Sequence, residues 1–111
     1  MVNGSPSRLD SVFSALSDST RRAILAQLAL GDQTVGAVAK PFSTSLPAIT
    51  KHLNVLEDAG LITRRAVGRQ KFCRAEPLAI KEAFDWMEHY RQFWNERLDA
   101  LEDLLAKTTE P

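Results

Sequence analysis

Apolar residues recur at helical spacing through most of this chain, and the clearest case is the stretch 45–62, SLPAITKHLNVLEDAGLI. Ile49, Leu53 and Leu56 fall within about 60° of one another on a helix, the pattern of a face packed against a core. The opposite face is polar and not acidic until its far end, unlike an ordinary solvated face with mixed Glu and Lys. It carries Pro47, Thr50, Lys51, Asn54 and Asp58.

The ends of this helix are also marked in the sequence. Ser45 stands at the N-cap position, and Pro47 is acceptable in the first turn because the N–H it lacks has no helical partner there. Gly60 is placed to close the helix as its C′ residue. A helix that buries one face and presents Thr, Lys and Asn on the other suits the major groove of DNA.

Two apolar helices are predicted before this segment. Residues 1–8 are expected to be disordered, because a Gly-Ser-Pro-Ser stretch has little to pack against. A first helix runs over 9–16, and a second, capped by Asp18 or Ser19, runs to about Ala29. Their apolar rows are Leu9, Val12, Phe13 and Leu16 in the first, and Ile24, Leu25 and Leu28 in the second.

A third, shorter helix precedes the polar-faced one. Thr34 is placed to cap it, and Pro41 ends it after about residue 40. The small residues over 35–39 allow another helix to cross closely, and a turn over 42–44 leads into the next helix. Two short helices joined by a tight turn, the second exposing polar groups, form a helix-turn-helix.

Residues 61–75 read as a two-stranded hairpin with Gly68 in its turn. The hairpin holds five cations and no anion, and attached to a helix-turn-helix it is a wing. Its tip, Arg69, Gln70 and Lys71, is placed to reach a minor groove or its phosphates. The alternative is an exposed edge hairpin that uses charge to resist aggregation.

One uninterrupted helix is predicted over about 77–107, because that stretch contains neither Gly nor Pro. At 1.5 Å per residue it would span roughly 45 Å and outrun a domain of this size. A dimer would cover it, with the 9–16 helix also contributing; the alternative is a monomer in which the helix folds back. The predicted interface residues are Leu9, Val12, Phe13, Leu16, Tyr90, Trp94, Leu98, Leu101 and Leu105.

With 111 residues, the chain is expected to form one mainly α domain with a small β-hairpin over 9–107, followed by a tail at 108–111. The single cysteine, Cys73, excludes an intrachain disulfide and a thiolate zinc cluster. No apolar run approaches 18 residues and the polar start is no signal peptide, so no membrane contact is expected and the cytoplasm is the expected compartment.

The charges are segregated along the chain although their sum is zero. Residues 1–39 are neutral, residues 40–75 hold seven basic and two acidic groups (+5), and residues 76–111 hold four basic and nine acidic groups (−5). Such a distribution gives a neutral protein one basic face, which is what contact with phosphates requires.

The segments LSDSTRRAIL (16–25), SLPAITKHLNVLEDAGLI (45–62) and VGRQKFCRAEP (67–77) together resemble the ArsR-type family of bacterial winged helix-turn-helix repressors. The final helix resembles the branch of that family ending in a pattern such as FWNERLDALEDLL (93–105). The resemblance implies a homodimer that binds an inverted repeat in double-stranded DNA and represses transcription. It maps DNA-binding positions onto Ser45, Leu46, Pro47, Ala48, Thr50, Lys51, Asn54, Arg65, Arg69 and Lys71, and the hairpin tip adds Gln70.

Among these, Thr50 and Asn54 are the candidates for base edges, with Asn54 suited to adenine. Lys51 is suited to guanine or a phosphate. A winged-helix module that binds another protein is the alternative, although such a module has no need of five wing cations. No enzyme is expected, because no phosphate-binding loop, Ser/His/Asp arrangement or HExxH motif occurs.

The chain departs from the metal-sensing members of the family, so no metal or cofactor is expected. Where thiolate sensors carry Cys-x-Cys, residues 35–38 are Val-Gly-Ala-Val. Asp85 and His89 offer two ligands per chain, which would make a site only across a dimer. His52 suits packing or phosphate contact better than ligation, and Cys73 suits a buried apolar position. The effector stays open, as does whether an aromatic pocket beneath Trp86, Tyr90 and Trp94 binds a small molecule or only fills an interface.

Overall fold

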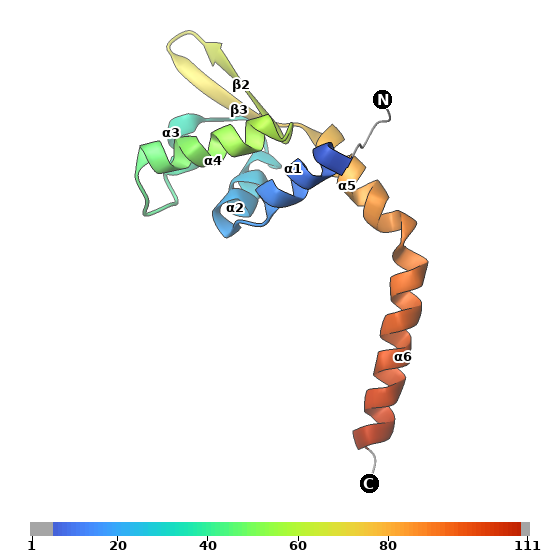
Figure 1. The fold of residues 1–111 in the computed structure, drawn as a ribbon. Helices are drawn as coiled ribbons and strands as arrows, with labels where there is room; N and C mark the ends of the chain where they lie inside the picture. The colour runs from blue at the N-terminus through green and yellow to red at the C-terminus, as the bar shows by residue number, and fades with distance from the viewer. Residues whose placement is uncertain (1–5, 110–111) are drawn as a thin grey trace.

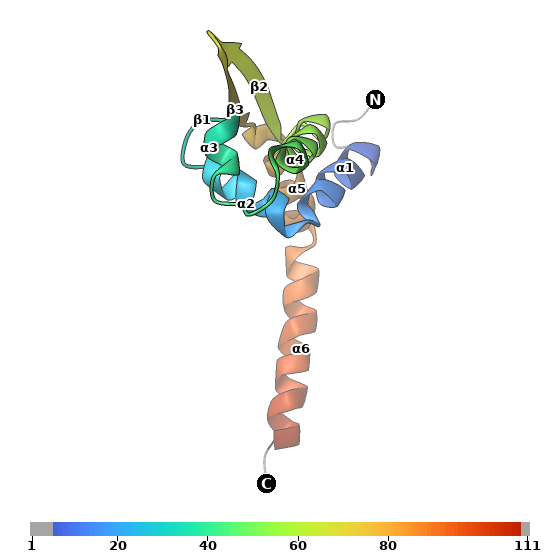
Figure 2. The same cartoon turned by 90° about the vertical axis from the view of Figure 1, so that its left-hand side faces the viewer.

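The computed structural model describes residues 6–109 and consists mainly of helices around a small antiparallel sheet (Figure 1). This agrees with the expected fold class. The hairpin and the last helix project toward opposite ends of the helical body (Figure 2). The elements are α1 (Pro6–Leu16), α2 (Ser19–Leu28), β1 (Gln33–Thr34), α3 (Val35–Ala39), α4 (Leu46–Asp58), β2 (Ile62–Val67), β3 (Gln70–Ala75), α5 (Pro77–His89) and α6 (Arg91–Thr109).

One apolar core lies where α1, α2, α3, α4, α5 and the base of the hairpin meet. The predicted inner face of α4 is confirmed, because Ile49, Leu53 and Leu56 are all 0% exposed. Cys73 is likewise fully buried, as a small apolar residue of β3. The remaining core residues are Val12, Ala15, Ile24, Leu28, Val38, Ala59, Leu61, Ile62, Ala79 and Ala83.

Side-chain caps fix the starts of three helices. The backbone N–H of Arg21 donates to Oδ2 of Asp18 at 3.0 Å, so Asp18 rather than Ser19 caps α2. Thr34 caps α3, and Ser45 caps α4 by accepting from the N–H of Ala48 at 3.3 Å. These contacts satisfy backbone donors that have no partner inside the helix.

Gly60 ends α4 as predicted. Its φ of 77° lies in the left-handed region, which suits glycine because it has no Cβ. The N–H of Leu61 then donates back to the carbonyl oxygen of Leu56 at 2.9 Å, which closes the helix and turns the chain into β2.

Both predicted termini of the folded region differ from the structure. Helix α1 begins at Pro6, so the expectation of disorder is wrong for 6–8, while residues 1–5 lie outside the described part. Proline at a first helical position costs little, which the composition argument overlooked. At the other end α6 reaches Thr109, two residues into the predicted tail, and 110–111 lie outside the described residues.

The sheet has three strands, one more than predicted, in the order β1-β3-β2. The additional strand β1 spans only two residues, with Gln33 opposite Cys73 and Thr34 opposite Phe72. So short a strand leaves no alternation of apolar and polar residues, so the sequence carries no signal for it.

The prediction of one long C-terminal helix is wrong, because the chain bends between α5 and α6 at Tyr90 (Figure 1). The N–H of Tyr90 donates to the carbonyl oxygen of Met87, three residues back, at 3.1 Å. Tyr90 has φ −103° and ψ 5°, a conformation open to any residue, so a helix can end there without Gly or Pro. Helix α5 packs on α1, and the ring centroids of Phe13 in α1 and Trp86 in α5 lie 5.8 Å apart.

Candidate nucleic-acid interface

Helix α4 presents its predicted polar face to solvent. Lys51 and Asn54 are exposed and Thr50 is half-buried, on the side of the helix away from the core. At its N-terminus Leu46 is 53% exposed, and Pro47 is exposed beside it. Ala48 is half-buried, and the hydroxyl of Ser45 already accepts the capping hydrogen bond.

Helices α3 and α4 form the predicted helix-turn-helix. The five residues of α3 are Gly36 and four alanine or valine residues, of which Val38 is 0% exposed. Between the two helices, the N–H of Phe42 donates to the carbonyl oxygen of Ala39 at 3.0 Å, and the Phe42 ring packs against the core. The turn therefore fixes where α4 starts.

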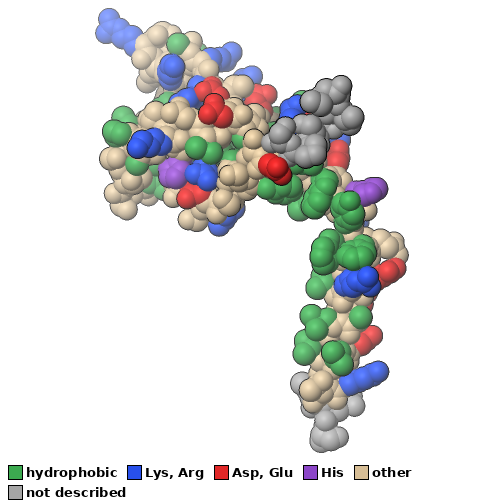
Figure 3. All heavy atoms as spheres, in the orientation of Figure 1, with side chains coloured by type: hydrophobic (Ala, Val, Ile, Leu, Met, Phe, Trp, Pro, Cys, Tyr) green, Lys and Arg blue, Asp and Glu red, His purple; other side chains and the backbone are tan. Residues whose placement is uncertain are grey.

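The hairpin has the two-residue turn expected of a compact wing. Val67 pairs with Gln70, which leaves Gly68 and Arg69 as the two turn residues. Gly68 has φ 60°, the positive value required at the first central position of a type II′ turn. Lys and Arg side chains project from the far end of the hairpin (Figure 3).

The register divides the predicted wing residues between two faces. Residues opposite one another in an antiparallel pair point to the same side of the sheet. Arg64 pairs with Cys73 and Ala66 with Lys71, so Lys71 lies on the same face as the buried cysteine, toward α4. Arg65 and Gln70 lie on the opposite face.

Two of the five hairpin cations are already paired with carboxylates from elsewhere in the chain. Arg74 contacts Asp32 at 3.0 Å, and Arg64 contacts Glu57 of α4 at 2.7 Å. The Arg64 hydrogen bond lowers the pKa of Glu57, so this carboxylate stays ionised. Across the described part of the chain, Arg65, Arg69 and Lys71 take part in no salt bridge. The wing therefore offers three cations for phosphates, fewer than the sequence count.

Arg64 also contacts the candidate base-reading residue of α4. Its Nη2 donates to Oδ1 of Asn54 at 2.6 Å, in addition to its bond to Glu57. Helical and strand periodicity in the sequence does not predict this contact. The sequence hints at it only through opposite charges on neighbouring elements, with Arg64 on the first wing strand and Glu57 near the end of the preceding helix.

A second polar cluster joins the start of α2 to α4. Arg21 donates from Nε to the carbonyl oxygen of Ala15 at 2.6 Å and from Nη2 to that of Ser14 at 3.2 Å. Its Nη1 lies 3.3 Å from Nδ1 of His52, which also lies 3.8 Å from Oδ2 of Asp18. The cluster ties α4 to the SDSTRR segment at the start of α2.

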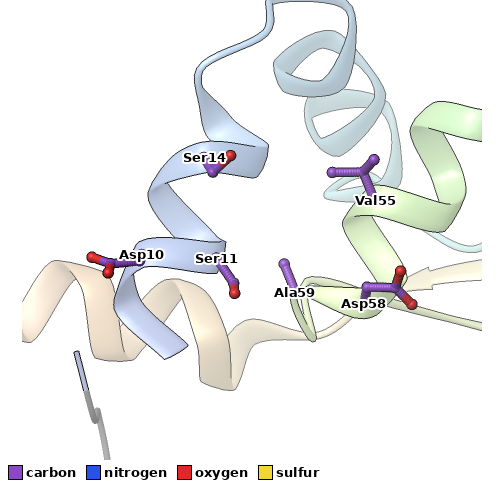
Figure 4. A pocket seen from close by; sticks show the side chains of 6 residues that line it. All are labelled: Asp10, Ser11, Ser14, Val55, Asp58 and Ala59. Carbon is purple, nitrogen blue, oxygen red and sulfur yellow. The ribbon is translucent and has the colours of Figure 1, made fainter. Parts of the chain in front are cut away.

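A hollow with two aspartates at its rim lies between α1 and the C-terminal end of α4 (Figure 4). It has a volume of about 390 Å³, and Ser11 and Ala59 point into it from the two helices. The carboxylates of Asp10 and Asp58 point away from one another, to either side. The hollow therefore lacks the convergent polar groups of a ligand site.

The candidate metal ligands named from the sequence make other contacts in the structure. Within residues 6–109, no three His, Cys, Asp or Glu side chains are grouped to hold an ion. Asp85 is bound to Lys81 at 2.7 Å, and the ring of His89 packs edge-on against Tyr90 at 4.9 Å. Burial raises the pKa of the Cys73 thiol, which disfavours the thiolate that a metal needs.

The predicted dimer residues separate into two groups. Val12 is 1% exposed and Leu16 packs against the core of the same chain, so neither forms an exposed interface. Leu9 is half-buried, and Phe13, 36% exposed, lies at the rim against Trp86. The α5–α6 residues Tyr90, Trp94, Leu98, Leu101 and Leu105 are 40–58% exposed. Hydrophobic side chains accordingly line one side of α6 (Figure 3).

Comparison with known proteins places this geometry in a family. The helix-turn-helix domain family matches residues 16–65. Transcriptional repressor SdpR of Bacillus subtilis is 35% identical over 82 residues, which cover 74% of this chain and 91% of SdpR. HTH-type transcriptional regulator Rv2034 of Mycobacterium tuberculosis is 32% identical over 96 residues, covering 86% of this chain and 87% of Rv2034.

The crystal structure of an ArsR family transcriptional regulator superposes with a TM-score of 0.76 at 38% identity, covering 81% of this chain and 93% of that one. The chain belongs to the ArsR-type family of winged helix-turn-helix transcriptional regulators. The resemblance seen in the sequence is thus confirmed, and this ArsR-type chain is a DNA-binding transcriptional regulator. Over the described residues, none of its helices combines the length and apolar character needed to cross a membrane.

Proposed function

We propose that this regulator is a homodimeric repressor that acts in the cytoplasm and binds a palindromic operator. The observation that carries the proposal is the salt bridge of Arg64 with Glu57, which fixes the wing beside the polar face of α4. Lys71 lies on the same face of the hairpin as Arg64, and Arg64 contacts α4 at Asn54, on the side that also carries Thr50 and Lys51. Together they form one surface that combines base-reading groups with cations for phosphates.

The exposed apolar face of α6 supports the dimer. Trp94, Leu98, Leu101 and Leu105 lie on one side of the helix and are all at least half exposed. A contiguous apolar stripe of this length is covered in solution, and a second copy offers a matching stripe by symmetry. Two α4 helices related by a twofold axis then enter successive major grooves about one helical turn apart, which requires an inverted repeat.

Each part of the surface has its own role in this proposal. Thr50 and Asn54 face base edges, Lys51 faces guanine or a phosphate, and the α4 N-terminus lies against the backbone. The wing residues hold phosphates or a minor groove through their positive charge. The DNA-binding set is Ser45, Leu46, Pro47, Ala48, Thr50, Lys51, Asn54, Arg65, Arg69, Gln70 and Lys71.

The test is fluorescence anisotropy of the full chain on its own upstream DNA and on a random duplex, at two salt concentrations. Asn54→Ala should weaken binding to the specific site by about 1–3 kcal/mol and leave the random duplex unaffected. Arg69→Ala should weaken binding to both and flatten the salt dependence. Equal losses on both duplexes for Asn54→Ala would remove Asn54 from the base-reading set. Absence of binding to either duplex by the unmodified protein would favour a protein-interaction module instead.

A further inference from the structure

Arg64 lies at the junction of the wing and α4, and it makes three hydrogen bonds to that helix. Nη2 donates to Oδ1 of Asn54 at 2.6 Å and to Oε1 of Glu57 at 2.7 Å. The backbone N–H of Arg64 donates to Oε2 of the same glutamate at 3.2 Å. The Arg64 side chain is only 15% exposed, so Glu57 holds it in a defined place.

This contact fixes which end of the Asn54 amide meets the arginine. A guanidinium has five N–H donors and no acceptor, so it can bond only to the oxygen of an amide. Oδ1 of Asn54 therefore faces Arg64, and the amide plane is held by a charge-assisted bond. The Nδ2 amide nitrogen of Asn54 keeps both of its donors free, whereas Oδ1 has only one lone pair left beside the guanidinium.

We propose that Arg64 is a positioning residue that makes Asn54 read guanine rather than adenine, an inference that rests on the proposed DNA binding. Bidentate recognition of adenine requires Oδ1 to accept from N6 while Nδ2 donates to N7. With Oδ1 bound by a cation, the adenine N6 donor would have to share that oxygen with the guanidinium. Guanine instead presents two neighbouring acceptors, N7 and O6, to the Nδ2 donors.

The experiment measures base preference in the full-length protein. The operator is first selected from a random duplex library, and the base pair read by Asn54 is the one at which Asn54→Ala loses discrimination. Dissociation constants are then measured on four duplexes that differ only at that pair. The unmodified protein should bind the guanine duplex about tenfold more tightly than the adenine duplex, and Arg64→Ala should reduce or reverse that ratio.

A second variant and a control separate positioning from a general loss of structure. Glu57→Gln leaves the core residues of α4 in place but removes the charge that anchors Arg64, so it should also lower the guanine-to-adenine ratio. Arg65→Ala, on the opposite face of the hairpin, should weaken binding to all four duplexes equally and leave the ratio unchanged.

The outcomes distinguish this inference from the proposed function on which it rests. An adenine preference in the unmodified protein overturns the inference and leaves specific DNA binding intact. A guanine preference that persists in both Arg64→Ala and Glu57→Gln also overturns it, because the arginine then does not set the preference. Failure of the unmodified protein to select any operator refutes specific DNA binding itself, and the inference falls with it.

Discussion

Replacement of Leu98 by Ala tests whether the exposed face of α6 is a dimer interface. Leu98 lies in the middle of the stripe and is 58% exposed in the single chain. Alanine is the best helix former, so the substitution removes apolar surface without weakening α6. The variant therefore changes the proposed interface and leaves the helical body unaltered.

The expected magnitude follows from the exposed fraction of the side chain. Complete burial of a leucine contributes about 1.5–3 kcal/mol. Leucine has three more carbons than alanine, each worth about 0.8 kcal/mol when buried, so covering a little over half of them contributes about 1–1.5 kcal/mol per protomer. A twofold dimer contains the substitution twice, so the dimer should weaken by about 2–3 kcal/mol, or about 30- to 150-fold in the dimer dissociation constant.

Sedimentation equilibrium over a concentration series measures this dissociation constant, and circular dichroism checks that helix content is unchanged. Asp103→Ala is the matched control, because Asp103 is an exposed residue of α6 on the side opposite the stripe. A dissociation constant unchanged by Leu98→Ala, or a monomeric parent protein, would refute the assignment of this face to a dimer.

Two further predictions concern stability. Leu53 is a fully buried residue of α4, and Leu53→Ala should lower the free energy of unfolding, measured by urea denaturation, by about 2–5 kcal/mol. Val55 is 39% exposed, so Val55→Ala should lower it far less. Similar losses in the two variants would contradict the assignment of the core face. The hydrogen bond that Asp18 accepts from the Arg21 N–H lowers the pKa of Asp18 below its usual 3.8. The ionised carboxylate therefore stabilises the fold above pH 3.8, and this contribution is lost as the pH falls through the lowered pKa. Asp18→Asn keeps the cap but cannot titrate, so thermal unfolding of this variant should depend less on pH between 2 and 5, and an identical pH profile would argue against this role for Asp18.

Local rules were enough to predict α4 and its surroundings from the sequence. The inner face of Ile49, Leu53 and Leu56 follows from helical periodicity, since each apolar residue three or four positions on repeats the same direction. The ends follow from capping chemistry, because Ser45 supplies an acceptor and Gly60 a positive φ. The same reasoning found the hairpin turn at Gly68.

The C-terminal region shows where such rules stop. Absence of Gly and Pro permits a continuous helix but does not enforce one, and the chain bends at Tyr90 where α5 packs on α1 and α6 leaves the body. Likewise, periodicity showed that Val12 belongs to an apolar face but not which residues cover that face. In the structure the core of the same chain buries Val12, and only the way α1 packs decides this.

The sequence by itself determined α4 with its caps, the hairpin turn and the resemblance to the family, because each depends on residues near one another in the chain. The tertiary structure alone decided the charge and geometry of the site. Arg74 bonds to Asp32, 42 residues away in the sequence, and Arg64 of β2 bonds to Glu57 and Asn54 of α4. These contacts reduce the free cations of the wing and orient the amide of Asn54. Pairing between distant residues depends on how the elements pack, and that is not readable from local spacing.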